Sequence, residues 1–171
     1  MTGTRRGGGG AAVALAVALL IPAGLAAQQG PRDRLLVDAE WLRAHAQDDD
    51  LVLLHVGPES EYAAGHIPGA RHVTLDMIAA PEDHDAGAGL SLQLPEPAAL
   101  ARALEGLGVS DGSRIVVYWG PEGWATPAAR VVFTLDWIGL GSRTSVLQGG
   151  MDAWTAAGGT PTAEVAAAGA G

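Results

Sequence analysis

The stretch Tyr118 to Arg130, which reads YWGPEGWATPAAR, has the form of a site where an enzyme could hold a nucleophile or bind an anion. It continues the short apolar run Ile115–Tyr118, contains glycines, and leads into residues that predict a helix. In α/β proteins, a strand followed by a glycine-bearing loop and a helix N-terminus presents backbone N–H groups to a negatively charged group. The first position of this loop is Trp119, although chemistry at such a position requires a nucleophile.

The composition excludes several kinds of site and partner. The chain of 171 residues has no cysteine, which rules out disulfides, Fe–S clusters, zinc sites built from thiolates and cysteine nucleophiles. It also has no lysine and carries 19 acidic against 10 basic residues, so we expect neither nucleic acid nor an anionic membrane surface as a partner. Motifs of the P-loop, G-x-S-x-G and H-E-x-x-H types are absent from the sequence.

Residues 1–27 are typical of a secretory signal peptide. Arg5 and Arg6 give a basic start, 11–21 are apolar, and the small residues of 22–27 suit signal peptidase. The apolar run is about half of the roughly 20 residues that span a bilayer, so we favour cleavage after Ala26 or Ala27 over an uncleaved anchor. We therefore expect an exported protein, periplasmic or secreted, that makes no membrane contact after cleavage.

After a linker over 28–34, residues 35–161 predict one α/β domain, and 162–171 predict a C-terminal linker or a truncated end. Apolar runs predict strands at 35–37, 51–56, 70–73, 115–118 and 145–147. Amphipathic stretches predict helices at 38–46, around 61–62, from 95 to about 106, at 128–138 and at 151–157. This alternation predicts a mostly parallel five-stranded sheet with helices on both faces.

The long loop 79–93 contains the acidic cluster Glu82-Asp83-His84-Asp85. Such a cluster could hold a hard metal ion, but sequential acidic residues in a loop are usually solvated, so we predict no metal site.

Two segments resemble the signatures of rhodanese domains. EYAAGHIPGARHV, from Glu61 to Val73, resembles the signature that follows the second strand, and VLQGGMDAW, from Val146 to Trp154, resembles the closing signature. The resemblance covers about Leu35 to Pro161 and implies a rhodanese-like fold. In this reading the glycines and proline form tight turns, and Trp154 is a core anchor.

The resemblance also implies that the loop after the fourth strand corresponds to the active-site loop of rhodanese enzymes. In rhodanese enzymes a cysteine begins this loop and carries sulfane sulfur, cradled by backbone N–H groups. Trp119 occupies that position here, Pro121 removes one N–H donor, and Glu122 adds a negative charge. The resemblance therefore implies a remnant active-site loop with no catalytic residue, made of Trp119, Gly120, Pro121, Glu122, Gly123 and Trp124.

The same region is similar to the N-terminal domain of tandem thiosulfate or 3-mercaptopyruvate sulfurtransferases, whose C-terminal domain carries the cysteine. Ala128-Ala129-Arg130, the apolar helix after them and the segment SLQLPEP carry this likeness. It implies a structural N-terminal half that is inactive alone, needs no cofactor, and has a cysteine-bearing C-terminal rhodanese domain as its partner. The alternatives are a stand-alone exported rhodanese-like binding or regulatory module, and an unrelated enzyme that uses the loop differently.

Several residues allow two interpretations. His66 resembles the histidine that faces the interdomain cleft in the 3-mercaptopyruvate branch, with Arg130 as the second candidate cleft residue, although we favour a turn-stabilising hydrogen bond for His66. Trp119 and Trp124 either stack on a ligand or, as we favour, fill the vacated pocket and pack against a partner domain. The family's second strand often ends in Leu-Asp-Val-Arg, and the replacement His55-Val56-Gly57 weakens any direct part in binding substrate.

Overall fold

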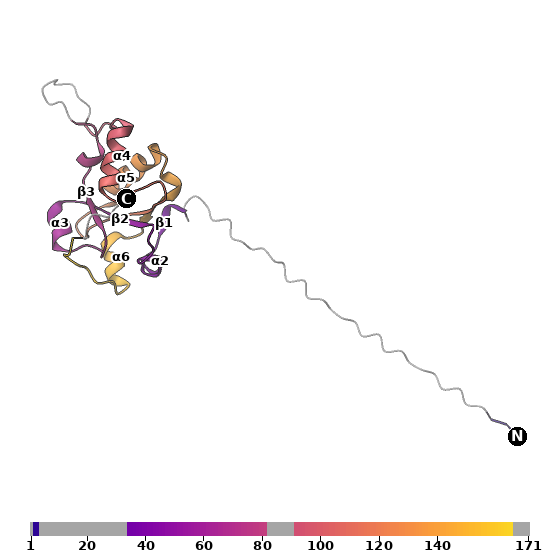
Figure 1. The fold of residues 1–171 in the computed structure, drawn as a ribbon. Helices are drawn as coiled ribbons and strands as arrows, with labels where there is room; N and C mark the ends of the chain where they lie inside the picture. The colour runs from indigo at the N-terminus through magenta and orange to yellow at the C-terminus, as the bar shows by residue number, and fades with distance from the viewer. Residues whose placement is uncertain (1, 4–33, 82–90, 166–171) are drawn as a thin grey trace.

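The computed structural model describes residues 2–3, 34–81 and 91–165, and these contain one five-stranded parallel sheet (Figure 1). The strand order is β1-β5-β4-β2-β3, and every neighbouring pair is parallel. The strands are β1 (Leu36–Val37), β2 (Leu51–Val56), β3 (Arg71–Val73), β4 (Arg114–Trp119) and β5 (Thr144–Leu147). The predicted α/β class and its five-stranded sheet are confirmed. The expected signal peptide and the acidic cluster 82–85 lie outside the described residues.

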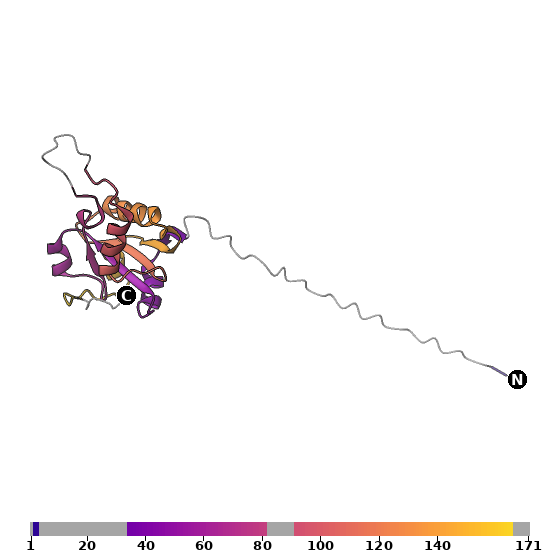
Figure 2. The same ribbon diagram turned by 45° about the horizontal axis from the view of Figure 1, so that its top comes forward.

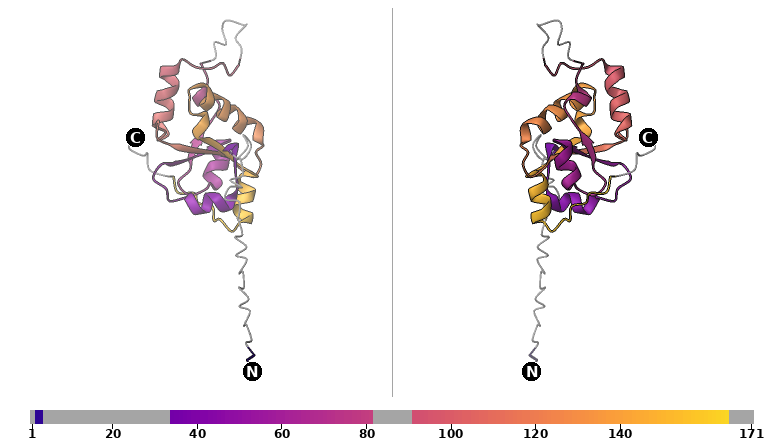
Figure 3. Two further views of the ribbon diagram at one scale, coloured as in Figure 1. Left: turned by 90° about the vertical axis from the view of Figure 1, so that its right-hand side faces the viewer. Right: turned by 90° about the vertical axis from the view of Figure 1, so that its left-hand side faces the viewer.

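Helices cover both faces of the sheet, as predicted (Figure 2, Figure 3). The helices on one face are α2 (Ala39–His45), α3 (Glu59–Ala64) and α6 (Gly150–Ala156), and those on the other are α4 (Pro97–Gly106) and α5 (Ala125–Trp137). Short 3-10 turns are η1 (Asp76–Ile78) and η3 (Gly141–Arg143). Because neighbouring strand residues point to opposite faces, Val116 lies in the core layer under α2, α3 and α6, and Val117 lies in the core layer under α4 and α5. Within the described residues, none of these helices combines the length and hydropathy needed to cross a membrane.

Three predicted boundaries shift for identifiable reasons. Helix α4 begins at Pro97, where a proline occupies the first turn, and not at Pro95. Helix α5 begins at Ala125, three residues before the predicted start, because Pro127 fits a first turn whose N–H groups have no partner within the helix. Trp119 was expected to open the loop, but it pairs with Val56 of β2 and is the last residue of β4.

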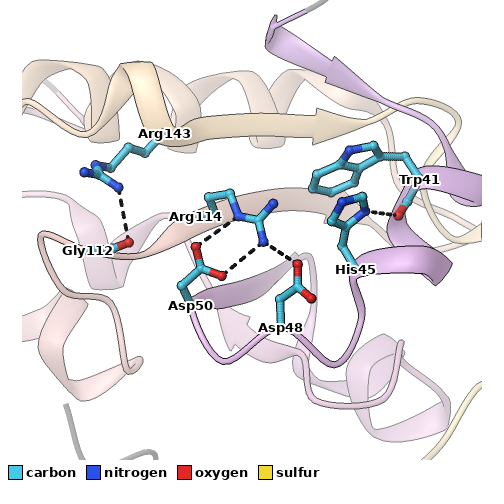
Figure 4. Close-up of polar contacts among 7 residues, drawn as sticks. All are labelled: Trp41, His45, Asp48, Asp50, Gly112, Arg114 and Arg143. Carbon is cyan, nitrogen blue, oxygen red and sulfur yellow. Dashed lines mark hydrogen bonds and ion pairs between the residues drawn. The ribbon is translucent and has the colours of Figure 1, made fainter.

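Ion pairs hold the amino end of β4 against the segment that leads into β2 (Figure 4). The guanidinium of Arg114 donates to Asp48 over 2.5 Å and to both carboxylate oxygens of Asp50 over 3.0 and 3.1 Å. The hydrogen bond from Arg114 lowers the pKa of Asp50, and the two carboxylates raise the pKa of Arg114. Arg114 also lies over the ring of Trp41, 5.6 Å from its centroid, and Trp41 stacks on His45. Two carboxylates of this end thus share one guanidinium.

The chain after α6 returns to the turn before β3. Thr162 and His66 exchange backbone hydrogen bonds of 2.9 Å and form an isolated antiparallel bridge. Trp154 of α6 is 7% exposed, which confirms the predicted core anchor. Residues 161–164 therefore lie against the domain, next to the end of α3.

Candidate functional site

The loop 120–124 lies at the carboxyl edge of the sheet, directly after β4 and between the ends of β5 and β2. The N–H of Gly123 donates to the carbonyl of Gly120 over 3.1 Å, which closes a tight turn, and Trp124 caps α5 with extended backbone. Open parallel sheets bind their ligands at this edge. The loop that the sequence singles out therefore lies where the fold would place an active site.

Trp119 fills space at this edge. It is half-buried and packs against the core layer under α4 and α5 and against the backbone of Gly150. A Cβ added at Gly150 would lie 2.8 Å from the carbonyl oxygen and 2.9 Å from the indole Nε1 of Trp119, and Gly150 has a φ of +57°. Only glycine combines this backbone conformation with this close approach. The glycine pair before α6 thus makes room for the tryptophan.

The backbone of the loop is bonded to a carboxylate of the same chain. The N–H of Glu122 donates to Oε1 of Glu61, on α3, over 3.0 Å. The carboxylate also lies against the backbone of Gly120, where any Cβ would overlap it, and near Gly57, where a Cβ would lie 2.8 Å from Oε2. Pro121 has no N–H to offer. A side chain from α3 therefore occupies the donor of this loop that a bound anion would need.

His55, the residue before the last of β2, lies next to this carboxylate. It has no exposed surface, neither ring nitrogen has a hydrogen-bond partner, and Nε2 is 3.8 Å from Oε2 of Glu61. Its ring packs edge-on against Tyr62 and His72 and at a tilt against Tyr118. Burial, with a smaller effect of the charges of His72 and His66, lowers the pKa of His55 from 6.5 to about 4. His55 is therefore neutral at pH 7 and does not balance the charge of Glu61.

His66 is fully buried and bonded to backbone. Its Nδ1 lies 2.8 Å from the carbonyl of Tyr62 and its Nε2 lies 3.0 Å from the carbonyl of Glu164, while its ring stacks on the ring of Tyr62. These contacts fasten the segment 161–164 to the end of α3. His66 has no surface that faces an open cleft in this structure.

Arg130, the second residue assigned to a cleft, lies on α5 on the opposite face of the sheet from α3. Its guanidinium donates to the carbonyl of Leu92 and lies over the ring of Phe133, 5.6 Å from the centroid. Among the described residues no hydrogen bond, ion pair or ring contact joins Arg130 to His66. The structure does not bring the two candidate cleft residues together.

A cavity of about 310 Å³ opens beside the loop. It lies between α3, the loop and α6, and the returning C-terminal segment forms one of its walls. Its lining combines three carboxylates with apolar side chains: Glu61, Ala64, Gly65, Pro121, Glu122, Met151, Asp152, Thr155 and Pro161. No arginine or histidine lines it.

These residues cannot transfer sulfur through a cysteine thiolate. The chain has no cysteine, so no thiolate can carry sulfur. Across residues 34–81 and 91–165, side chains of the metal-binding types do not gather in any group of three that could hold a metal ion. The site offers hydrogen-bond acceptors and negative charge, and thus suits binding of a positively charged group.

Sequence patterns alone do not assign three residues to this site. His55 stands out only because it replaces a residue common in the family, and Glu61 and Asp152 only belong to the two signature segments. A signal existed for Glu61, because α3 follows β2 and the loop follows β4, and β2 and β4 are neighbours in the sheet. Both segments therefore begin at the same edge. The hydrogen bond itself depends on side-chain geometry that no sequence pattern encodes.

Comparison with known proteins agrees with this fold. The sequence model of the family described as Rhodanese-like domain matches residues 38–157. The chain is 34% identical over 128 residues to the 3-mercaptopyruvate sulfurtransferase of Escherichia coli K12, a match that covers 69% of this chain and 43% of the relative. It is 33% identical over 129 residues to thiosulfate/3-mercaptopyruvate sulfurtransferase 2 of Arabidopsis thaliana, with 75% of this chain and 33% of the relative covered.

Among solved structures, that of SseA from Escherichia coli, a 3-mercaptopyruvate sulfotransferase with the "rhodanese" fold, superposes with a TM-score of 0.62 and 27% identity. The superposition covers 74% of this chain and 50% of that chain. This chain therefore spans half or less of the length of these relatives.

Proposed function

Because this chain belongs to the rhodanese-like domain family, we propose that it is the structural N-terminal half of a tandem thiosulfate or 3-mercaptopyruvate sulfurtransferase and is inactive alone. The observation that carries the proposal is the loop after β4. Trp119 stands at the position where the resemblance places the cysteine, and Glu61 bonds the N–H of Glu122. Sulfur transfer then requires a thiol from a second domain, and the shorter span of this chain relative to the sulfurtransferases supports such a partner.

An exposed apolar face on α5 supports docking of a second domain. Phe133 is 53% exposed and Trp137 is 42% exposed, and because they are four residues apart they lie on the same side of the helix. Trp124, which caps the same helix, is 68% exposed. Large apolar side chains that gather on one surface mark an interaction site more often than chance exposure.

The direct test compares this chain alone with a covalent fusion to a cysteine-bearing rhodanese domain. We expect no thiosulfate:cyanide or 3-mercaptopyruvate sulfurtransferase activity from this chain alone. In the fusion, the cysteine-bearing domain should be more stable and more active than when free, and Phe133→Glu together with Trp137→Glu should reduce that gain. Equal stability and turnover of the fused and free domains would favour a stand-alone binding module, the reading that the acid-lined cavity supports.

We also propose that the chain is exported, on the evidence of its N-terminal sequence. Expression of the full chain in a bacterium, followed by mass measurement of the product, tests this. A periplasmic or secreted product that begins at Ala27 or Gln28 is expected. A product in the cytoplasm that retains residues 1–27 would contradict export.

A further inference from the structure

Both ring nitrogens of His66 face backbone carbonyls. Nδ1 lies 2.8 Å from the carbonyl oxygen of Tyr62, Nε2 lies 3.0 Å from that of Glu164, and the ring is fully buried. A carbonyl oxygen only accepts hydrogen bonds, whereas an uncharged imidazole has one N–H and one bare nitrogen. The uncharged ring therefore satisfies one carbonyl and turns a lone pair toward the other. The positively charged ring has two N–H groups and satisfies both.

The surroundings of the ring also suit a positive charge. The ring stacks on Tyr62 with the centroids 3.8 Å apart and the planes at 9°, and the face of an aromatic ring is its negative side. His55 of β2 adds no repulsion at neutral pH, because its pKa is lowered to about 4. Further ionisable groups lie on the elements around this site: Glu61 of α3, Arg71 and His72 of β3, Tyr118 of β4, Asp152 of α6 and Glu164 of the segment 161–164. Arg71 and His72 oppose a positive ring, but the two carbonyls contact it directly, and hydrogen bonds from a charged donor are about twice as strong as neutral ones.

Two other histidines among the described residues contact a carbonyl, each through one ring nitrogen. Nδ1 of His45 lies 2.8 Å from the carbonyl of Trp41, and Nε2 of His72 lies 2.7 Å from the carbonyl of Gly57. An uncharged ring satisfies either arrangement, so loss of a proton leaves these contacts in place. His66 differs because its two carbonyls require two donors.

The second carbonyl belongs to the segment 161–164, which forms one wall of the cavity beside the loop. Thr162 and His66 exchange two backbone hydrogen bonds, and Pro161 lies against Gly65, where a Cβ would be 3.3 Å away. Thr162 is half-buried, while Pro161, Ala163 and Glu164 are exposed. Because little apolar surface holds this segment, the hydrogen bond from Nε2 of His66 is a large part of its attachment.

We propose that His66 is a pH-dependent latch for this wall of the cavity. When positively charged, it donates to both carbonyls and holds the segment 161–164 against the domain. As the pH rises through the range in which histidines lose a proton, one of the two donors disappears, the segment detaches more often, and the cavity beside the loop opens. The attachment is therefore strongest at low pH. This inference holds whether the chain is half of a tandem enzyme or a separate module.

The experiment follows His66 and the segment by NMR in the full chain between pH 5 and 8. Nitrogen-15 shifts of the ring tell whether one or both nitrogens carry hydrogen, and the hydrogen-exchange rate of the Thr162 amide, divided by its intrinsic rate at each pH, measures attachment. At pH 5.5 we expect hydrogen on both nitrogens. From pH 5.5 to 8 the protection of Thr162 should fall about tenfold or more, the effect of one hydrogen bond from a charged group. A single ring hydrogen at pH 5.5, or protection that does not change with pH, would overturn the proposal.

Variants assign the pH dependence to His66. His66→Gln has no titratable group there and should protect Thr162 equally at pH 5.5 and 8. Thr162→Pro removes the N–H that donates to the carbonyl of His66 and leaves the buried ring in place, so it keeps the test valid if the glutamine variant folds poorly. At pH 6.5 a smaller fraction of its His66 should carry two ring hydrogens than in the original chain.

The matched control is His45→Gln, since His45 contacts a single carbonyl, and this variant should show the pH dependence of the original chain. His55 acts in the opposite direction, because its burial without charge makes low pH unfavourable for the fold, so stronger attachment at low pH does not come from it. Unchanged pH dependence in His66→Gln, or equal fractions of doubly protonated His66 in Thr162→Pro and the original chain, would contradict the latch.

Discussion

Oε1 of Glu61 and the backbone nitrogen of Glu122 lie 3.0 Å apart and share a hydrogen bond, so α3 holds the loop that follows β4. The loop of an active rhodanese would turn its N–H groups toward a sulfur-bearing cysteine. Here one of those groups is bonded to the protein itself, Pro121 has no N–H, and Trp119 stands where the resemblance places the nucleophile. The inactivity that we propose thus has three separate structural causes.

We predict that Trp119→Cys does not create a sulfurtransferase. The new thiol would lie beside a loop whose free donors are depleted and whose nearest charges are negative, and loss of one such donor costs about a hundredfold or more in rate. Thiocyanate formation from thiosulfate and cyanide should stay at least about a hundredfold below that of a cysteine-bearing relative. Turnover within tenfold of that relative, in a variant that folds by circular dichroism, would show that the loop is intact.

The Glu61 contact should be visible in stability. Glu61→Ala leaves the N–H of Glu122 without its acceptor and should lower the free energy of unfolding by about 1–2 kcal/mol. Glu61→Gln keeps an oxygen acceptor and removes a largely buried charge, so it should be neutral or stabilising. Glu59→Gln, an exposed position on the same helix, is the control in urea denaturation. A loss as large for Gln as for Ala would mean that the charge, and not the hydrogen bond, holds the loop.

His55 should make stability depend on pH. Its pKa is lowered to about 4 in the folded chain, against 6.5 as the ordinary value. Between these values the unfolded chain binds more protons, so stability is complete above pH 6.5 and falls as the pH falls toward 4. From pH 6.5 to 5 the loss should be about 1.5 kcal/mol. Urea denaturation of His55→Leu beside the original chain isolates this effect, and identical pH profiles would contradict it.

Gly150 should be far less tolerant of a side chain than a helical glycine elsewhere. At Gly150→Ala, the positive φ and the contact with Trp119 together should cost more than about 2 kcal/mol. Gly106→Ala is the matched control, because no atom lies within 4 Å of a Cβ there, and it should be neutral or stabilising. In a Trp119→Ala background the cost at Gly150 should fall, which a double-mutant cycle in thermal or urea unfolding measures. An unchanged cost would show that Trp119 does not depend on this glycine.

The sequence predicts the layers of this fold well because the apolar runs are short and sharply bounded. Leu51–Val56 appears as predicted, and the Asp38 side chain caps α2 through a 2.7 Å hydrogen bond from the N–H of Trp41. Boundaries near proline shift, since Pro127 is compatible with a first helical turn as well as with a loop before it.

The site is less predictable than the fold. The loop and its position follow from the order of strand, glycine and helix, but the bond from Glu61 depends on how a side chain of one helix reaches a neighbouring loop. His66 shows the same limit in another way. From the sequence, His66 fits either a cleft residue or a turn residue. Only the structure shows that its ring nitrogens contact the carbonyls of Tyr62 and Glu164.

The two ends of the sheet differ in how their carboxylates are paired. At the amino end Asp48 and Asp50 share the guanidinium of Arg114, whereas the lining of the cavity at the carboxyl end holds Glu61, Glu122 and Asp152 without an arginine. The domain therefore repels small anions from the edge where its loop lies and attracts cations there, over a distance of about 8 Å at physiological ionic strength. Cations therefore reach this edge faster than anions do, and added salt reduces the difference between the two rates.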